Sequence, residues 1–134
     1  VKEKILSEKK KTLHMNGMGV FSFAIKQVPA MISDLQKQYN LMHDDISYLI
    51  LHQANKNIID IINKETNFID KSLISISDFG NTASASIPIT ICHNKKLLEN
   101  KNINCLLVGF GVGLSWSSCQ INFNNTNINE IFYY

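Results

Sequence analysis

Hydrophobic and polar residues follow a helical period over residues 20–38. The hydrophobic side chains return at steps of three and four and so line one face of a helix: Phe21, Ala24, Ile25, Val28, Met31, Ile32 and Leu35. Asn16-Gly17 forms a strong turn pair just before this segment. Pro29 lacks a backbone N–H and predicts a bend rather than an end. We therefore predict a bent helix with one buried face.

After this helix the pattern changes to short hydrophobic runs that alternate with helical segments. Residues 46–51 form a nearly continuous apolar run, typical of a strand covered on both faces. The later segments are a helix at 54–65, a strand at 73–76, a helix at 82–98, and strands at 104–110 and 114–123. Only Gly111-Val112-Gly113 separates the last two strands. This alternation predicts an α/β fold: a mixed, mostly parallel sheet with crossover helices and a C-terminal antiparallel hairpin.

The hydrophobic pattern ends near residue 123. A chain of 134 residues that is 45% hydrophobic is expected to build one domain around one core. Residues 122–129 are rich in asparagine and are expected to form a poorly ordered extension. We therefore divide the chain into a folded domain over residues 1–123 and an Asn-rich tail over residues 124–134.

Composition excludes several classes of partner and site. The 13 basic and 11 acidic side chains nearly balance, which argues against nucleic acid as a partner. No apolar run is long enough to span a membrane, and the lysine-rich residues 1–11 have no apolar segment behind them, so they are not expected to form a secretory signal. Cys92, Cys105 and Cys119 are odd in number and lack metal-binding spacing, so disulfides and zinc are not expected. A reduced, cytoplasmic compartment fits best.

Three segments with polar or glycine residues, at 51–55, 78–88 and 108–116, fall where predicted strands end. In open α/β sheets, ligands gather outside the carboxyl ends of the strands. A lone histidine at a strand end is more often structural than catalytic, and a lone Gly-Asn pair is usually a turn. The three segments carry functional weight only in combination.

The combination resembles the C-terminal half of β-ketoacyl-acyl-carrier-protein synthase III, a thiolase-superfamily condensing enzyme. The residues that carry the resemblance are His-Gln-Ala-Asn at 52–55, Gly-Asn-Thr at 80–82, Ile-Pro at 87–88 and Gly-Phe-Gly-x-Gly-Leu-Ser-Trp at 109–116. The lead-in Leu-His-Met-Asn-Gly at 13–17 is also similar to the family. Together these segments extend over nearly the whole chain.

The resemblance implies a fold and an activity. Family members are homodimers of two fused thiolase-like halves, and this chain corresponds to most of the second half without its opening strand. A cysteine in the first half is acylated from acyl-CoA. Malonyl-acyl-carrier protein then loses carbon dioxide, and its carbanion attacks the acyl group in fatty acid biosynthesis. No cofactor is implied beyond these substrates, and neither nucleic acid nor a membrane is an expected partner.

The resemblance also assigns roles to residues. His52 and Asn81 match the two non-nucleophilic catalytic residues, which donate hydrogen bonds to the developing oxyanion. A backbone N–H of Gly111-Val112-Gly113 is expected to serve a second oxyanion, and Phe110 to wall the site. The expected substrate-binding residues are Asn16, Gly17, Phe21 and Asn55, and the expected carrier-protein docking residues are Lys26, Lys56 and Lys64.

The nucleophilic cysteine is expected in the missing N-terminal half. Cys92 lies inside a predicted helix, whereas Cys105 and Cys119 lie in or beside strands, and none has the cationic or helix-N-terminal setting of a reactive thiolate. The chain alone is therefore expected to be inactive. The opening of the helix at 82–98, rich in Ala and Ser, is expected to pack against the absent half and to promote self-association in its absence.

Two other functions stay open. Asn57 stands where the family usually has arginine, and Glu65 follows Lys64, so the positive docking surface is thinner than usual. This favours a synthase III paralogue of a specialised pathway. The chain could instead be a non-catalytic half that binds acyl-CoA or a partner.

Metal binding by His43, Asp44 and Asp45 is less expected than solvated loop charge, because adjacent side chains diverge.

Overall fold

The computed structural model describes residues 15–99 and 102–133, so the part of the family lead-in at residues 13–14 lies outside the described residues. Its centre is a sheet of three strands, β1 (Tyr48–Leu51), β2 (Ile103–Gly111) and β3 (Ser115–Phe123), in that spatial order. β1 pairs with β2 in parallel, with Leu51 opposite Val108. β2 and β3 form the predicted antiparallel hairpin. The sheet is thus mixed, with one parallel and one antiparallel pair.

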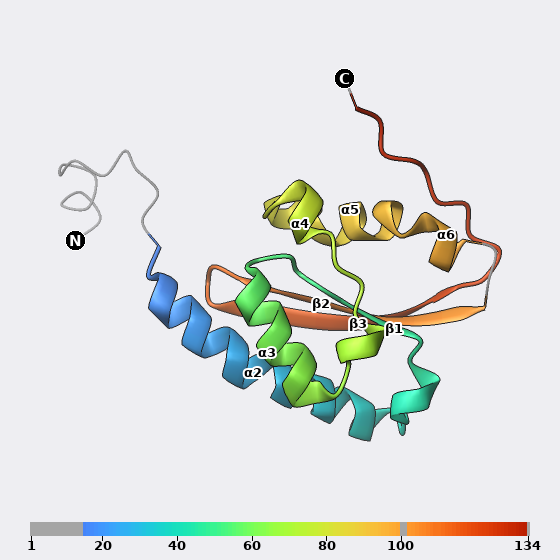
Figure 1. Ribbon diagram of the computed structural model, residues 1–134. Helices are drawn as coiled ribbons and strands as arrows, with labels where there is room; N and C mark the ends of the chain where they lie inside the picture. Colours follow the sequence, from blue (N-terminus) through green and yellow to red (C-terminus); the bar gives the residue numbers. More distant parts are fainter. Residues whose placement is uncertain (1–14, 100–101, 134) are drawn as a thin grey trace, which may run out of the picture.

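Two long helices cover one face of the sheet (Figure 1): α2 (Gly17–Gln38) and α3 (Lys56–Thr66). The first predicted helix is confirmed and ends at Gln38, but it starts earlier than expected. Asn16 explains the start, because its side-chain oxygen accepts a hydrogen bond from the Gly19 N–H at 2.9 Å and caps the helix. The predicted buried face is also present in the fully buried side chains of Ala24, Val28 and Ile32, each four residues apart.

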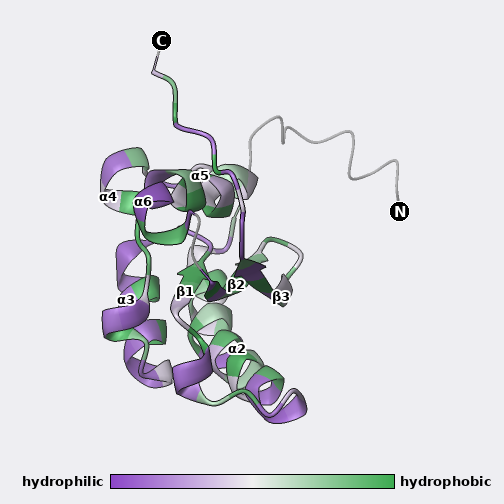
Figure 2. Cartoon of the chain, turned by 90° about the vertical axis from the view of Figure 1, so that its right-hand side faces the viewer, coloured by the Kyte–Doolittle hydropathy of each residue, from purple (hydrophilic) through white to green (hydrophobic). Residues whose placement is uncertain are grey.

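Short helices cover the opposite face, so that the sheet lies between two helical layers in both views (Figures 1 and 2). They are α4 (Ile76–Phe79), α5 (Ser86–His93) and α6 (Lys95–Leu98). The remaining single turns are the 3-10 helices at His43–Asp45, Ile69–Lys71 and Ala83–Ala85. Successive side chains of β1 point to opposite faces of the sheet. Leu49 and Leu51 join the core cluster under α2 and α3, whereas Ile50 joins the cluster under α5 and α6.

The strand predicted at residues 73–76 is wrong. Only one parallel bridge forms there, between Leu49 and Ser72, supported by a hydrogen bond from the Leu73 N–H to the Leu49 carbonyl. Further along, the backbone N–H groups of Ser75 and Ile76 both bond to the side-chain oxygen of Gln53. A buried side chain thus takes the place of a neighbouring strand, and the backbone turns into α4.

The single helix predicted at residues 82–98 is also wrong, because it is broken at two places. Ala83 has a left-handed φ of 52°, which a continuous α-helix cannot contain. Near the other end, the side-chain and backbone N–H groups of Asn94 both bond to the Thr90 carbonyl and end α5. Regular helix therefore runs only from Ser86 to His93, followed by the short α6.

The tail beyond β3 differs from the poorly ordered extension that its composition suggested. Asn122 and Phe123 still belong to β3. Ile128 is buried in the cluster under α5 and α6, and its N–H bonds to the side chain of Glu99 at 3.3 Å. Tyr133 stacks on Phe79 with ring centroids 6.3 Å apart. The asparagine-rich composition gave no sign that Ile128 would pack into the core.

β3 is an edge strand of this sheet, and most of its side chains are exposed. Trp116 and Ile121 are among the exposed large hydrophobic side chains. Ala83, Ser84 and Ala85 on the helical layer are exposed as well. Within residues 15–99 and 102–133, no helix has the length and apolar character needed to cross a membrane.

Candidate active site

His52 stands directly after β1, at the carboxyl edge of the sheet. Its N–H bonds to the Val108 carbonyl at 2.8 Å, which extends the β1–β2 pairing by one residue and fixes the backbone. The ring lies edge-on to Phe110 of β2, with centroids 5.4 Å apart. The parallel register therefore brings the first and third polar segments together, as expected for strand ends.

Gln53 is fully buried and joins β1 to α4. Its side-chain N–H group donates to the Leu51 carbonyl at 2.8 Å, and its side-chain oxygen accepts from Ser75 and Ile76 at 2.9 and 3.1 Å. Because these bonds satisfy both ends of the buried amide, Gln53 has a structural role. It holds the chain segment that leads to Asn81 against the end of β1.

Asn81 lies in the loop after α4, and two hydrogen bonds orient its side chain. The side-chain oxygen accepts from the Ala83 N–H at 2.9 Å, and the side-chain nitrogen donates to the Ala54 carbonyl at 3.2 Å. An amide nitrogen carries two hydrogens, so one donor of Asn81 stays available. Gly80 permits this loop, because its φ of 66° lies in the left-handed region.

The His52 ring has one committed and one uncommitted nitrogen. Nδ1 lies 2.6 Å from the hydroxyl oxygen of Ser86, the first residue of α5. Nε2 has no hydrogen-bond partner among residues 15–99 and 102–133. Burial lowers the pKa of His52 from its ordinary value of 6.5, because removal from water disfavours the charged imidazolium. His52 is thus a neutral side chain with one nitrogen left for a ligand.

The three polar segments line one cavity of about 870 Å³. His52 and Asn81 both line it, together with Phe110, Gly111 and Val112 of the hairpin. The other lining residues come from the start of α2 and from the segments around α3 and α5: Met15, Gly17, Val20, Phe21, Ala54, Asn55, Asn57, Ile58, Ala83, Ser84, Ser86, Ile87 and Gly109. Side chains that are far apart in the sequence thus surround one mostly apolar space with a few polar groups, the usual form of a small-molecule site.

The structure divides the expected substrate-binding residues. Gly17, Phe21 and Asn55 line the main cavity. Asn16 does not; it caps α2 and lines a smaller neighbouring cavity with Gly113. Asn55 combines both functions, because its side-chain oxygen also caps α3 by accepting from the Asn57 N–H at 2.9 Å.

Ser86 is the residue that sequence reasoning missed. We interpreted it as one of several small residues that allow close helix packing. A better signal was its spacing from Thr90, since both are polar and lie four residues apart on one face of an otherwise apolar helix. Both are buried, and the Thr90 hydroxyl donates to the Ser86 carbonyl at 2.7 Å.

None of the three cysteines lines this cavity. Cys105 is buried within β2, and burial raises the pKa of its thiol to about 12. Cys119 is exposed on β3, and Cys92 lies within α5. A thiol with a pKa of about 12 carries almost no thiolate at neutral pH, so Cys105 is not a nucleophile.

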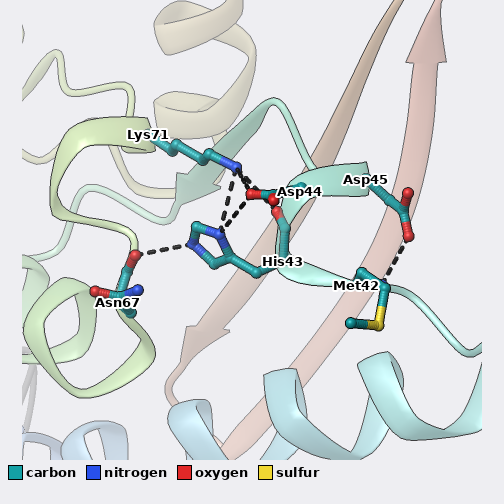
Figure 3. Close-up of polar contacts among 6 residues, drawn as sticks. All are labelled: Met42, His43, Asp44, Asp45, Asn67 and Lys71. Atoms are coloured by element: carbon teal, nitrogen blue, oxygen red, sulfur yellow. Dashed lines mark hydrogen bonds and ion pairs between the residues drawn. The ribbon is translucent and has the colours of Figure 1, made fainter.

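The acidic cluster at residues 43–45 lies before β1, outside this cavity (Figure 3). His43 Nε2 bonds to the Asn67 carbonyl at 2.9 Å, and Lys71 Nζ lies 3.3 Å from both His43 Nδ1 and Asp44 Oδ1. Lys71 lowers the pKa of Asp44 through this hydrogen bond. Asp45 instead accepts from the Met42 N–H at 2.7 Å. Among the described residues, no three acidic, histidine or cysteine side chains group in a way that could hold a metal ion.

The three expected docking lysines differ in their surroundings. Lys56 forms an ion pair with Asp60, with Nζ 2.6 Å from Oδ1, so its charge is largely compensated. Lys26 and Lys64 are exposed on α2 and α3.

Comparison with known proteins identifies relatives of this chain. Residues 35–123 match the family described as 3-oxoacyl-[acyl-carrier-protein (ACP)] synthase III C terminal. The β-ketoacyl-[acyl-carrier-protein] synthase III of Prochlorococcus marinus strain MIT 9515 is 40% identical over 114 residues, which cover 82% of this chain and 33% of that protein. The enzyme of the same name from Streptococcus agalactiae strain NEM316 is 42% identical over 112 residues, with coverage of 81% and 35%.

Solved structures give the same result. The chain superimposes on 3-oxoacyl-(acyl-carrier protein) synthase from Burkholderia xenovorans LB400 with a TM-score of 0.85 and 28% identity, over 96% of this chain and 37% of that one. For the synthase III of Thermus thermophilus the TM-score is 0.81 at 28% identity, with coverage of 90% and 38%. These neighbours confirm the expected thiolase-like α/β class. The chain spans about a third of the length of the curated relatives that it matches.

Proposed function

The chain belongs to the 3-oxoacyl-[acyl-carrier-protein] synthase III family, and from this premise we propose that it is the C-terminal catalytic region of an enzyme that condenses acyl-CoA with malonyl-acyl-carrier protein in fatty acid biosynthesis. The observation that carries the proposal is that His52 and Asn81, from two separate segments, line one cavity, where the His52 ring keeps an uncommitted Nε2 and the Asn81 amide keeps one uncommitted N–H.

Decarboxylation needs donors rather than a strong base. When the malonyl thioester loses carbon dioxide, the electrons of the broken C–C bond move onto the thioester oxygen as an enolate. His52 Nε2–H and the second N–H of Asn81 would donate hydrogen bonds to that oxygen. A neutral histidine with its hydrogen on Nε2 can fill this role, so the lowered pKa of His52 is compatible with it. The apolar wall of the cavity, including Phe110, strengthens both hydrogen bonds.

The second half of the reaction would use the hairpin and a cysteine from the rest of the enzyme. The enolate carbon attacks the acyl thioester on that cysteine, a C–C bond forms, and the thiolate leaves. A backbone N–H of Gly111-Val112-Gly113 would stabilise the tetrahedral oxyanion in between. Gly17, Phe21 and Asn55, which also line the cavity, would contact the substrate. No metal or cofactor is needed for either step.

The partners of this region follow from the same proposal. Acyl-CoA and acyl-carrier protein would be substrates, and Lys26 and Lys64 would offer positive charge to the carrier protein. The remaining N-terminal half, with the cysteine, would cover exposed surfaces such as residues 83–85, in a homodimer of the complete enzyme. The cytoplasmic location inferred from the cysteine content stays a prediction.

The test of this proposal is reconstitution. Purified chain supplied with acetyl-CoA and malonyl-acyl-carrier protein should not form product, whereas the same region joined to a cysteine-bearing N-terminal half should, in a way that depends on His52. Turnover by the chain alone, unchanged when Cys92, Cys105 and Cys119 are all replaced by serine, would show that the chemistry is different.

One observation favours a specialised-pathway enzyme as the second candidate. Asn57 lines the cavity at the position where the family usually has arginine, and Lys56 beside it is paired with Asp60. Both features weaken the positive surface that a housekeeping carrier protein would meet. Rates with carrier proteins from primary and specialised pathways would distinguish the two, and faster turnover with the housekeeping carrier would exclude the second candidate.

A further inference from the structure

We propose that Ser86 is a positioning residue that holds His52 in the tautomer with its hydrogen on Nε2. This inference deepens the proposed function, because the oxyanion role of His52 requires a donor at Nε2. It rests on the hydrogen bonds of the Ser86 hydroxyl group, which are formed within the protein and do not depend on a bound ligand.

The Ser86 hydroxyl is placed between two groups of the β1 end. Its oxygen lies 2.6 Å from His52 Nδ1 and 3.3 Å from the backbone nitrogen of Gln53. Ser86 is only 1% exposed, so water does not compete for these contacts. The contact therefore links α5 directly to the residue at the end of β1.

Counting hydrogens gives the direction of the short contact. The backbone N–H of Gln53 can only donate, so the Ser86 oxygen accepts from it. The hydroxyl group has one hydrogen, and within the described part of the chain His52 Nδ1 is its only acceptor. If Nδ1 carried the hydrogen instead, the buried hydroxyl hydrogen would be left without an acceptor, which is unfavourable. Nδ1 is therefore the acceptor, and the ring hydrogen is on Nε2.

A second network holds Ser86 in place. The Thr90 hydroxyl donates to the Ser86 carbonyl at 2.7 Å, and the Ser75 hydroxyl lies 2.6 Å from the Thr90 oxygen. Since Thr90 has one hydroxyl hydrogen and uses it on Ser86, Ser75 is the donor in that second contact. Ser75 is in turn bound to Gln53 through its backbone N–H. Ser86 is thus held through Thr90 and Ser75, and this chain of hydrogen bonds leads back to Gln53 at the end of β1.

The tautomer decides whether His52 can act. With hydrogen on Nε2, the ring presents a donor to the cavity; with hydrogen on Nδ1, it would present a lone pair that repels an oxyanion. Burial beside Phe110 keeps the ring neutral, so the choice between tautomers is the one that matters. Ser86 would act through His52 and would not touch the substrate oxygen.

The test is a long-range proton–nitrogen correlation spectrum of the ¹⁵N-labelled chain, which distinguishes protonated from unprotonated ring nitrogens. A His52→Ala spectrum identifies the His52 signals. The wild-type chain should show unprotonated Nδ1 and protonated Nε2. Ser86→Ala should move the tautomer ratio toward Nδ1–H by roughly tenfold, the size of one hydrogen bond, and Ser86→Thr, which keeps the hydroxyl, should restore the wild-type ratio.

Two outcomes overturn the inference: wild-type His52 with its hydrogen on Nδ1, or an unchanged ratio in a folded Ser86→Ala chain. If Ser86→Ala does not fold, the wild-type spectrum and Ser86→Thr still decide. The measurement needs no activity, so it is separable from the proposed function. Should the tautomer be as stated while His52→Ala leaves the complete synthase fully active, the function fails and the role of Ser86 stands.

Discussion

The two ends of β1 each carry a histidine next to polar residues, and the two sites differ in what they leave unused. Before the strand, His43 bonds through Nε2 to the Asn67 carbonyl and through Nδ1 to Lys71 (Figure 3). The His43 ring also packs on the buried Phe68. After the strand, the His52 ring bonds through Nδ1 to Ser86, and its Nε2 has no partner within the described part of the chain. One histidine is fully occupied by the protein, whereas the other keeps a nitrogen for a ligand.

The difference separates a structural cluster from a site. At the His43 end, charges meet at the solvent surface: the Asp44 side chain is 97% exposed and contacts Lys71. At the His52 end, the described residues that line the cavity include no Asp, Glu, Lys or Arg, and the donors face a mostly apolar space. Donors in such a setting interact strongly with a developing charge, because little water screens them. An uncommitted donor in a cavity, rather than the density of polar residues, is what makes the His52 end the candidate site.

The largest effect is expected from Asn81→Asp in the complete synthase. The aspartate keeps an oxygen that can accept from the Ala83 N–H, but it removes the N–H donors and adds a negative charge. Loss of an oxyanion donor should lower kcat by roughly 100- to 1,000-fold while the fold is kept. Steady-state kinetics and a thermal melt check both parts. A fully active Asn81→Asp enzyme would remove Asn81 from the site.

Gly80→Ala sharpens the comparison by testing the left-handed backbone conformation of the loop at the His52 end. Gly80 has φ of 66°, so any other residue there is strained, and we expect a loss of about 1–2 kcal/mol in the free energy of unfolding. Gly109→Ala is the matched control, since an added Cβ there meets no atom within 4 Å and its φ is not left-handed. Urea unfolding of both variants measures the contrast. Equal stability would contradict the loop conformation.

His43→Ala should lower the free energy of unfolding by about 1 kcal/mol, because it removes hydrogen bonds to Asn67 and Lys71 at the structural end. Asp44→Asn should cost less, since that side chain is exposed and its ion pair is screened by water. Urea unfolding again gives the values. A larger loss for Asp44→Asn than for His43→Ala would mean that charge, not the histidine, holds this end together.

The smallest effect is expected in the pH dependence of the free energy of unfolding, where the two ends of β1 should contribute in different pH ranges. The pKa of His52 is below its ordinary value of 6.5 in the folded chain, so the unfolded chain takes up a proton first and stability falls as the pH drops below about 6.5. The pKa of Asp44 is also lowered, so its contribution is present above 3.8 and is lost only below that pH. Unfolding measured against pH should show two windows, the first absent in His52→Gln and the second in Asp44→Asn. A His52→Gln chain that keeps the first window would contradict this assignment.

The sequence predicted the parts of the fold that local pattern determines. The face of α2 follows from its spacing of apolar residues, and the β2–β3 hairpin follows from two β-runs joined by three residues. The strand at 73–76 was wrong because the side chain of Gln53 binds the backbone N–H groups of Ser75 and Ile76, which lie 22 and 23 positions further along the chain. A contact of this kind, between a distant side chain and the backbone, leaves no hydrophobic pattern in residues 73–76 from which it could be predicted.

The site was predictable to the same extent. His52, Asn81 and Phe110 could be singled out from their motifs, and all three line one cavity, although Asn81 follows the helix α4 rather than the strand that was predicted before it. Ser86 could not, because its contact with His52 spans 34 positions of the chain and depends on where α5 begins. That start is set by the left-handed Ala83 and the oxygen of Asn81, which shift the helix from its predicted beginning.

The most direct test of the comparison is the rate of malonyl-acyl-carrier-protein decarboxylation by the complete synthase with His52→Ala and, in parallel, with His43→Ala. Decarboxylation isolates the step in which the donors act. We predict a loss of roughly 100- to 1,000-fold for His52→Ala, the value of an oxyanion donor, and an unchanged rate for folded His43→Ala. Equal rates for the two variants would contradict the claim that the unoccupied nitrogen at one end of β1 defines the active site.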